Sequence, residues 1–348
     1  MKSPIIIVIF ALFLSVSLQA EKYAYKQVTK LMGVRFEITA VSDNEALARK
    51  SINEAILEIK RIENLISSWD QNSETSEINR NAGVKPVKVS KELFDLIVRS
   101  NKVSALTNGV FDISFASVDK IWKFDGSQTT IPSKESIAAS VSKINYQNIV
   151  LDKERHTVFL KEKGMKIGFG GIGKGYAANK AKAKMLVMGI KDGVVNAGGD
   201  LITWGKMEHG GDWSIGIANP KRKDEIMAWL IINDLAVVTS GNYEKFFIAD
   251  GKKYSHIINP TTGYPASGTK SVTIICKDAE LSDALATSVF ILGAKEGIEL
   301  IDKLKNIECL VVTDKNKMES SKGLKMNYYK IGRPENSANN STNLKTVK

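Results

Sequence analysis

A glycine-rich segment in the middle of the chain has the residue types that bind a phosphate group. Residues 168–175 read Gly-Phe-Gly-Gly-Ile-Gly-Lys-Gly and stand between a short apolar run, 165–167, and an Ala/Lys-rich stretch with helical spacing. We expect a strand at 165–167 and a helix at 176–188, with the glycines in the turn between them. Backbone N–H groups at the start of a helix favour an anion there, and the helix dipole adds to this preference.

The segment fits two known phosphate-binding patterns, each incompletely. Gly168, Gly170 and Gly173 have the spacing of the dinucleotide fingerprint, whereas residues 168–174 follow the P-loop up to its last position. A P-loop needs Ser or Thr after the lysine to hold magnesium, and Gly175 has no side chain for this. The dinucleotide motif normally belongs to the first βαβ unit, and this one lies in mid-chain. A purely structural turn is the third interpretation.

A second pair of residues suits a metal ion. Asp283 and Thr287 lie four positions apart in a segment with helical spacing, and we expect helices at about 281–292 and 294–304. Residues four apart on a helix face the same way. Two oxygen ligands on one face suit a hard cation such as magnesium, which keeps waters and takes further ligands from phosphate. The structural alternative is an acidic residue near a helix N-terminus, where it interacts favourably with the dipole.

One of the three histidines stands out from the other two. His156 and His209 occur in polar segments and are expected to be solvated, whereas His256 alternates with apolar residues before an Asn-Pro turn. This pattern predicts a strand that carries His256. The residue is then either a core histidine with satisfied hydrogen bonds or a positioned general base, because its ordinary pKa lies near neutrality.

The elements that must position these residues do not alternate regularly between strand and helix. We expect a strand at 28–41 that opens on Met32-Gly33, helices at 44–66 and 91–106, and a polar loop at 67–73 between them. Later segments predict short strands at 149–151, 157–160, 193–196, 201–205, 213–217, 227–232, 236–240 and 272–276. Partial segregation of helices and strands predicts an α+β fold, with helices packed on mixed or antiparallel sheets.

The N-terminus predicts export. Lys2 precedes an apolar run at 4–14 that is too short to span a bilayer, and residues 15–20 complete a signal peptide cleaved after Ala20. We expect a signal peptide at 1–20, one domain at 21–330 and a disordered tail at 331–348, which is rich in Asn, Ser and Lys. The expected location is the periplasm. An uncleaved N-terminal anchor is the alternative.

Composition narrows the class of partner. The chain has 348 residues, 43% of them hydrophobic, and a formal net charge of +11. This is enough apolar material for a globular core, and the scattered lysines favour small anions such as nucleotides over nucleic acid. Cys276 and Cys309 lie in apolar runs and are expected to be buried thiols, with a disulfide between them left open.

Eight segments, in this order and spacing, resemble the ApbE-like flavin transferases (FAD:protein FMN transferases). The resemblance runs from Met32 to about Gly293. The segments are Met32-Gly33, Trp69 with Ser-Glu-Ile-Asn at 76–79, Asn-Gly-Val-Phe-Asp at 108–112 followed by Trp122, Gly-Gly-Ile-Gly-Lys-Gly-Tyr-Ala at 170–177, Asn-Ala-Gly-Gly-Asp at 196–200, Thr-Ser-Gly-Asn-Tyr at 239–243, His256 to Gly263, and Asp283 to Thr287.

The resemblance implies an exported magnesium enzyme that cleaves FAD, attaches FMN through a phosphoester to Thr or Ser of a target protein, and releases AMP. It implies magnesium ligands at Asp283, Thr287 and the Gly171 carbonyl, with His256 as the candidate base. FAD would be the substrate, bound in a cleft between two subregions. The residues implied to line its site are Met32, Trp69, Val110, Phe111, Asp112, Gly168, Lys174 and Ile258.

The chain departs from the family pattern at three positions. Gly168 and Asn259 stand where the family usually has Asp, and Asn179 replaces a common Asp in the following helix. The first change removes a polar contact to the nucleotide, so affinity or substrate preference is expected to differ while activity is kept. The alternatives in function are an FAD pyrophosphatase, which uses water in place of the hydroxyl, and a non-catalytic periplasmic FAD-binding protein.

The resemblance also describes the acceptor. The family modifies a Ser/Thr-Gly-Ala-Thr type of motif, and this chain contains none. The acceptor is therefore expected to be another protein, such as an exported subunit of an ion-pumping redox complex or a secreted flavoprotein. We expect association with the membrane only through such targets, and no nucleic-acid partner.

Overall fold

The structure is a computed structural model that describes residues 21–118, 121–219 and 222–328. The predicted signal peptide at 1–20 and the predicted tail at 331–348 lie outside these ranges. Within them, an eight-stranded sheet forms the centre of the molecule, in the order β1-β2-β6-β7-β10-β13-β14-β15. Its strands are β1 (Tyr23–Leu31), β2 (Val34–Ser42), β6 (Asp192–Ala197), β7 (Asp200–Trp204), β10 (Ala236–Gly241), β13 (Thr269–Cys276), β14 (Glu308–Thr313) and β15 (Met318–Ser320).

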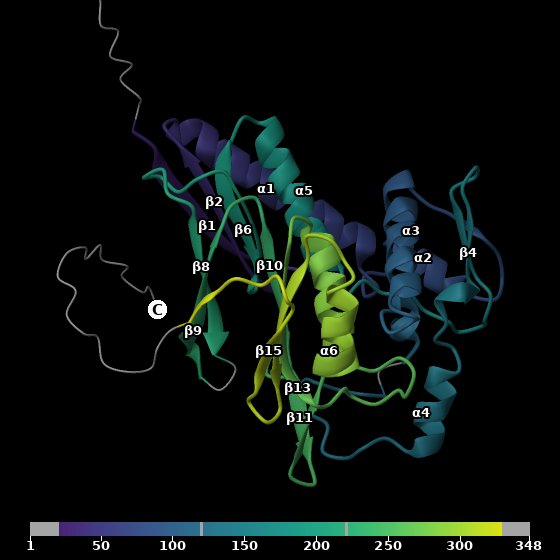
Figure 1. The fold of residues 1–348 in the computed structure, drawn as a ribbon. Coiled ribbons are helices and arrows are strands. Elements are labelled where there is room, and N and C mark those ends of the chain that lie inside the picture. The colour runs from purple at the N-terminus through teal and green to yellow at the C-terminus, as the bar shows by residue number, and fades with distance from the viewer. Residues whose placement is uncertain (1–20, 119–120, 220–221, 329–348) are drawn as a thin grey trace, which may run out of the picture.

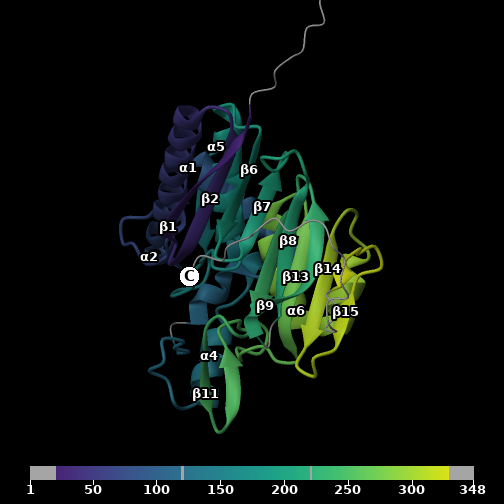
Figure 2. The ribbon, with the colours of Figure 1, turned by 90° about the vertical axis from the view of Figure 1, so that its left-hand side faces the viewer.

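Helices cover one face of this sheet and a second sheet covers the other (Figures 1 and 2). The helices are α1 (Glu45–Ile66), α5 (Gly173–Val187) and α6 (Ala279–Ile301), and α5 packs between the other two. The second sheet contains β8 (Trp213–Asn219), β9 (Arg222–Ile232) and β16 (Asn327–Tyr328). Trp213 and Leu230 of this sheet pack in one apolar cluster with Val237 and Ile275 of the central sheet. The core is therefore divided into two layers.

The remaining elements form a smaller region beside α5 and α6. It contains α2 (Glu74–Arg80), β3 (Val87–Lys88), α3 (Lys91–Leu106), η1 (Ile113–Val118), α4 (Lys134–Val141), η2 (Tyr146–Asn148), β4 (Ile149–Asp152), β5 (Thr157–Leu160) and the hairpin of β11 (Phe246–Ala249) and β12 (Lys252–Ser255). Figure 1 shows α3, α2, β4 and α4 on the side of the helices that faces away from the β8–β9 sheet. Every strand pair in the described residues is antiparallel, which confirms the predicted α+β class.

The predicted helices at 44–66 and 91–106 are confirmed as α1 and α3, and each begins at a capped residue. The Asn44 side chain accepts a hydrogen bond from the Leu47 N–H at 2.9 Å, and Ser90 caps α3 in the same way. Such caps satisfy N–H groups that have no partner inside the helix. The predicted break between two C-terminal helices is also found, since Gly293 has a non-helical backbone (φ 80°, ψ 178°) within α6.

The single strand predicted at 28–41 is wrong. Residues 23–42 form a hairpin, and Met32 and Gly33 are its turn, with φ of 50° and 75°. Two consecutive left-handed residues are typical of the tight turn that joins antiparallel strands. Alternating apolar residues continue across such a turn, so their pattern alone does not reveal it.

Three further predictions need correction. Residues 165–167 form no strand, and α5 begins at Gly173, three residues earlier than expected. His256 lies in a bend after β12 and not on a strand. The sequence patterns also missed several short elements, namely α2, α4, β11, β12, β14, β15 and β16. Short segments carry too few residues for a clear period.

The cysteines behave as predicted, and one of the solvated histidines does not. Cys276 and Cys309 are both free and buried. His209 is exposed as expected, but His156 is half-buried, with its ring 5.3 Å from the ring of Phe94. None of the helices in the described residues is long and apolar enough to cross a membrane.

The contact between α5 and α6 depends on a glycine and gives a first prediction. A Cβ at Gly175 would lie 2.0 Å from the Ala279 carbonyl oxygen. We expect Gly175→Ala to lower the free energy of unfolding by about 1–3 kcal/mol, because backbone atoms must move apart. The control is Gly211→Ala, whose Cβ would lie near two flexible side chains, the His209 ring at 3.1 Å and Cε of Met207 at 3.5 Å. Urea denaturation followed by circular dichroism measures both, and equal midpoints would contradict the prediction.

Candidate active site

The glycine-rich turn leads into α5, whose first turn contacts a carboxylate from α6. The N-cap residue of α5, Ile172, makes no side-chain capping bond. The Gly175 N–H instead donates to Oδ2 of Asp283 at 3.0 Å. The first N–H groups of a helix have no partner within it, so an acidic group there is stabilised by both hydrogen bonding and the helix dipole. Asp283 is thereby fixed against the start of α5.

Lys174 lies between two buried carboxylates. Its Nζ is 2.8 Å from Oδ2 of Asp200 and 3.2 Å from Oδ1 of Asp283. The exposed fractions of these two acids are 4% and 2%. Burial alone would lower the pKa of Lys174, but the two carboxylates outweigh it and hold this pKa above its ordinary value. The lysine is therefore charged. Burial raises the pKa of Asp200 to about 6, against the opposing effect of Lys174. With both carboxylates ionised above that pH, the cluster has one negative charge more than it has positive charges.

The three predicted magnesium ligands lie together. Asp283 and Thr287 are on one face of α6, and a Cβ built on Gly171 would lie only 3.1 Å from Oγ1 of Thr287. The backbone of residue 171 can approach this hydroxyl so closely only because it has no side chain. In the described part of the chain, no group of three or more His, Cys, Asp or Glu side chains is arranged to hold a metal. A carboxylate and a hydroxyl provide oxygen donors here, and the backbone of the third predicted ligand, Gly171, passes beside them, which fits the preference of magnesium for oxygen ligands.

Two residues expected to line the FAD site lie against the same turn. A Cβ on Gly173 would lie 3.5 Å from Cε of Met32, and a Cβ on Gly171 would lie 3.5 Å from Cε2 of Phe111. The Met32 N–H donates to Oε1 of Glu63 at 2.9 Å, which fixes the hairpin turn. The apolar side chains of Met32 and Phe111 therefore lie against the glycine-rich turn that carries Lys174.

The other residues expected to contact FAD are spread around this centre, and their role stays a prediction. The side chain of Trp69 is 76% exposed, in the loop between α1 and α2. Val110 and Ile258 are half-buried, and Ile258 packs on the apolar cluster that includes Trp122. A Cβ on Gly168 would lie 3.1 Å from Cβ of Ala116, so the space beside this glycine is filled in part by that methyl group.

Asp112 supports the loop that carries Phe111. Its Oδ1 accepts hydrogen bonds from the Ser114 N–H and hydroxyl at 2.7 and 2.6 Å, and its Oδ2 accepts one from the Tyr146 N–H at 2.8 Å. Burial raises the pKa of this carboxyl, and the hydrogen bonds oppose the rise. The carboxylate thus joins η1 to η2 and holds the neighbouring Phe111 beside Gly171 of the glycine-rich turn.

His256 has the environment of a neutral imidazole. Its Nδ1 is 3.2 Å from the Lys245 carbonyl oxygen, which only accepts hydrogen bonds, so Nδ1 carries the proton and Nε2 keeps its lone pair. Burial lowers the pKa of His256 to about 4, and the positive charges of Lys245 and Lys174 add to this effect. A neutral ring with a free Nε2 is suited to accept a proton.

An aromatic cluster fixes the segment that follows His256. The indole N–H of Trp122 donates to the Gly263 carbonyl at 2.8 Å. The Trp122 ring lies 5.9 Å from Phe247 and 6.5 Å from Tyr254 in stacked arrangements, and Phe124 meets His256 edge-on at 6.4 Å. Rings at these distances attract each other beyond their apolar burial. The β11–β12 hairpin and the turn after it are therefore held as one body.

Comparisons with known proteins decide the family. The sequence profile of the ApbE family matches residues 32–311. This chain belongs to the ApbE family. It is 32% identical over 293 residues to a FAD:protein FMN transferase of Klebsiella pneumoniae, covering 84% of this chain and 89% of that protein. The family assignment and this similarity identify the protein as a transferase.

Solved ApbE structures share the fold. The crystal structure of the ApbE protein of Thermotoga maritima superposes with a TM-score of 0.81 at 31% identity, covering 86% of this chain and 97% of that one. A flavin transferase ApbE from Vibrio cholerae superposes with a TM-score of 0.78 over 86% of this chain and 98% of its own, at 23% identity. The second similarity concerns the fold alone.

Asp200 is the site residue that sequence reasoning missed. It belongs to the Asn-Ala-Gly-Gly-Asp segment of the ApbE resemblance, in which the acid was assigned no role. In the structure it is the first residue of β7 and a direct partner of Lys174. The available signal was an acidic residue that follows a pair of glycines at a strand end.

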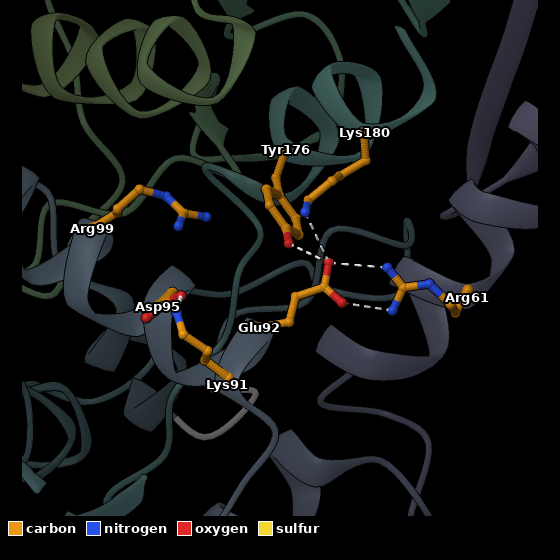
Figure 3. A pocket seen from close by; sticks show the side chains of 7 residues that line it. All are labelled: Arg61, Lys91, Glu92, Asp95, Arg99, Tyr176 and Lys180. Atoms are coloured by element: carbon orange, nitrogen blue, oxygen red, sulfur yellow. Dashed lines mark hydrogen bonds and ion pairs between the residues drawn. The ribbon is translucent and has the colours of Figure 1, made fainter. Parts of the chain in front are cut away.

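A second charged cluster lies on the other side of the first turn of α5. It lines a pocket of about 420 Å³ formed by Arg61, Lys91, Glu92, Asp95, Arg99, Tyr176 and Lys180. Figure 3 shows Glu92 at its centre, where it pairs with Arg61 at 2.7 Å and with Lys180 at 3.3 Å and accepts from the Tyr176 hydroxyl at 2.6 Å. The carboxylate joins α1, α3 and α5, and so fixes the helix that carries Lys174 in this ApbE protein.

This cluster predicts a pH-dependent contribution to stability. The Arg61 guanidinium, together with Tyr176 and Lys180, lowers the pKa of Glu92 to about 2, well below its usual value of 4.5. A lowered folded-state pKa stabilises the protein above about pH 4.5, and this contribution is lost as pH falls toward 2. We expect Glu92→Gln to cost about 1–2 kcal/mol at pH 7. The difference from wild type should shrink progressively below pH 4.5.

Urea denaturation between pH 3 and pH 7 tests this expectation. The matched control is Asp95→Asn, because Asp95 lines the same pocket and pairs with Lys91 at 2.5 Å in a more exposed position, with 42% of its side chain accessible. Exposed pairs contribute little, so this variant should lose less than about 1 kcal/mol at any pH. A cost of Glu92→Gln that stayed constant down to pH 3 would contradict the assignment.

Proposed function

We propose that this ApbE-family transferase moves FMN from FAD to a Thr or Ser hydroxyl of a target protein, in a magnesium-dependent reaction that releases AMP. The observation that carries the proposal is the juxtaposition of Lys174 and Asp283 at the N-terminus of α5, with Thr287 and the backbone of Gly171 beside them. These groups suit a pyrophosphate and the cation that accompanies it.

Each group of the chain has a distinct part in this reaction. Lys174 binds the pyrophosphate of FAD at the N-terminus of α5, where the helix dipole favours an anion. Asp283, Thr287 and the carbonyl of Gly171 would hold magnesium, which neutralises phosphate charge and stabilises the leaving AMP. Met32 and Phe111 cover the turn and limit the access of water. The buried Asp112 keeps Phe111 in place.

His256 receives the proton of the acceptor hydroxyl. The hydroxyl oxygen forms a bond to the FMN phosphorus, the bond from that phosphorus to the AMP oxygen breaks, and the proton moves to Nε2 of His256. The hydrogen bond from Nδ1 to the Lys245 carbonyl keeps the ring oriented for this role. Water in place of the acceptor hydroxyl would give FMN and AMP, which is the pyrophosphatase alternative.

The sequence supports a location and a class of acceptor. We propose that residues 1–20 direct export and that the enzyme works in the periplasm. Its acceptors would be exported redox-complex subunits or secreted flavoproteins with a Ser/Thr-Gly-Ala-Thr type of motif. FAD reaches such an enzyme as a diffusing small molecule, and the positive net charge of +11 assists the encounter.

The direct test is transfer to a defined acceptor. The purified protein is incubated with FAD, magnesium and an acceptor protein that carries the motif, and the acceptor is weighed by intact mass spectrometry. We expect a gain equal to esterified FMN, an equimolar release of AMP, and no gain after chelation of magnesium or in an acceptor whose motif Thr is replaced by Ala. Release of AMP and FMN without a mass gain would support the pyrophosphatase, and intact FAD would support the binding protein.

Replacing Asp283 gives a prediction for the metal site. Asp283→Ala removes the only carboxylate of the donor set, and we expect at least about a 100-fold loss of magnesium-dependent transfer. The control is Glu296→Ala, an exposed position on the same helix, which should keep full activity. Thermal melts of both variants report folding. Unchanged transfer by a folded Asp283→Ala variant would overturn the metal assignment.

The lowered pKa of His256 predicts the pH profile of its protonation. Because burial lowers this pKa to about 4, the ring stays neutral well below pH 6.5, where an ordinary histidine gains its proton. We expect the His256 ring to stay neutral from pH 7.5 to about 5.5 and to gain its proton only as pH approaches 4, which an NMR titration of the ring measures. A ring titration centred near pH 6.5 would contradict this environment. His256→Gln, which cannot accept the proton, should lose most of the transfer rate.

A further inference from the structure

We propose that Asp200 is a positioning residue that draws the Lys174 ammonium away from Asp283 and so leaves Asp283 available to magnesium. The inference rests on the proposed function for the presence of the metal, and it adds a determinant of metal affinity outside the ligand set. Asp200 itself is not a ligand in this account. It acts on the metal only through the position of Lys174.

Lys174 lies closer to Asp200 than to Asp283. Nζ of Lys174 is 2.8 Å from Asp200 and 3.2 Å from Asp283. The other oxygen of Asp200 accepts the Thr239 N–H at 3.0 Å, which ties this carboxylate to β10 of the central sheet. Asp200 is also almost fully buried, so water has little access to its carboxylate. Its position is set by the central sheet and not by the metal.

Lys174 and magnesium need the same carboxylate. Asp283 is the only acid among the predicted ligands, and its Oδ2 is already bound to the Gly175 N–H. Its Oδ1, the oxygen nearer to Lys174, is then the atom that both cations approach. Two cations on one oxygen repel each other strongly in a buried site, where the effective dielectric constant is low. The lysine must therefore move toward another anion when the metal binds.

Asp200 is that anion. When Asp200 is charged, the Lys174 ammonium can give up its contact with Asp283 and keep its contact with Asp200. The ammonium then remains paired with a negative charge. Without that charge, Asp283 becomes the only carboxylate in contact with Lys174, and the lysine competes directly with magnesium. Asp200 thus keeps Lys174 in the site, beside the expected position of the pyrophosphate. It also reduces the contact of Lys174 with Asp283, the carboxylate that magnesium needs.

Binding of Mg²⁺ to the metal-stripped protein, without FAD, tests the inference by calorimetry. We expect Asp200→Asn to weaken Mg²⁺ binding at least about tenfold and Lys174→Met to tighten it. The matched control is Asp192→Asn, because Asp192 is also largely buried and paired with a lysine, Lys22 at 2.6 Å, but lies at the opposite end of the β6–β7 pair. It should keep the wild-type affinity within about twofold.

A crystal structure with Mg²⁺ separates this account from a general charge effect. We expect Nζ of Lys174 to keep its contact with Asp200 and to leave hydrogen-bond distance of Asp283. A lysine that still contacts Asp283 beside the bound metal would overturn the proposal even if Asp200→Asn weakened binding. Asp200→Ser offers a second uncharged variant, should Asp200→Asn fail to fold.

Different results would overturn the role of Asp200 and the proposed function. Wild-type protein that binds Mg²⁺ through Asp283, with unchanged affinity in folded Asp200→Asn or Asp200→Ser, would overturn the role of Asp200 and leave the proposed transferase intact. Wild-type protein with no Mg²⁺ binding that depends on Asp283 would overturn both. Because binding is measured without substrate, a loss of catalysis for other reasons does not affect the result.

Discussion

The buried cluster of one lysine and two carboxylates is the interaction on which the site depends. Lys174 comes from α5, Asp200 from β7 and Asp283 from α6, so a single ammonium joins three elements that are far apart in the chain. Charges removed from water are costly unless they are paired at close range. Their pairing requires the two helices and the strand to keep one arrangement, and it leaves an excess of one negative charge, which favours a further cation.

Close backbone approach makes this cluster possible. Gly175 lets the first turn of α5 touch the start of α6, and Gly171 lets the preceding turn pass the Thr287 hydroxyl. A Cβ at Gly175 would lie 2.0 Å from the Ala279 carbonyl oxygen and would force the two helices apart, and one at Gly171 would crowd the Thr287 hydroxyl at 3.1 Å. The same glycines that resemble a phosphate-binding loop thus have a second role, which is to let the helix face that carries Asp283 and Thr287 lie next to a helix N-terminus.

The smaller region supplies the apolar side chain of Phe111 and the candidate general base, His256, to the site. Asp112 fixes the Phe111 loop, and the aromatic cluster around Trp122 holds the hairpin that leads to His256. On the far side of α5, Glu92 ties the same helix to α1 and α3. The site is therefore supported from both faces of α5, which is consistent with a transferase that must orient a flavin nucleotide.

The sequence alone determined the features that are local. Apolar spacing and capping residues located α1 and α3, the spacing of four placed Asp283 and Thr287 on one helix face, and the ordered motifs indicated the ApbE family. Only the tertiary structure decided that Asp200 pairs with Lys174, that Asp112 supports a loop, and that His256 lies in a bend. These facts depend on contacts between residues as far apart as Lys174 and Asp283, 109 positions in the chain. A local pattern reports periodicity and turns, whereas such contacts follow from the order of strands in the sheet.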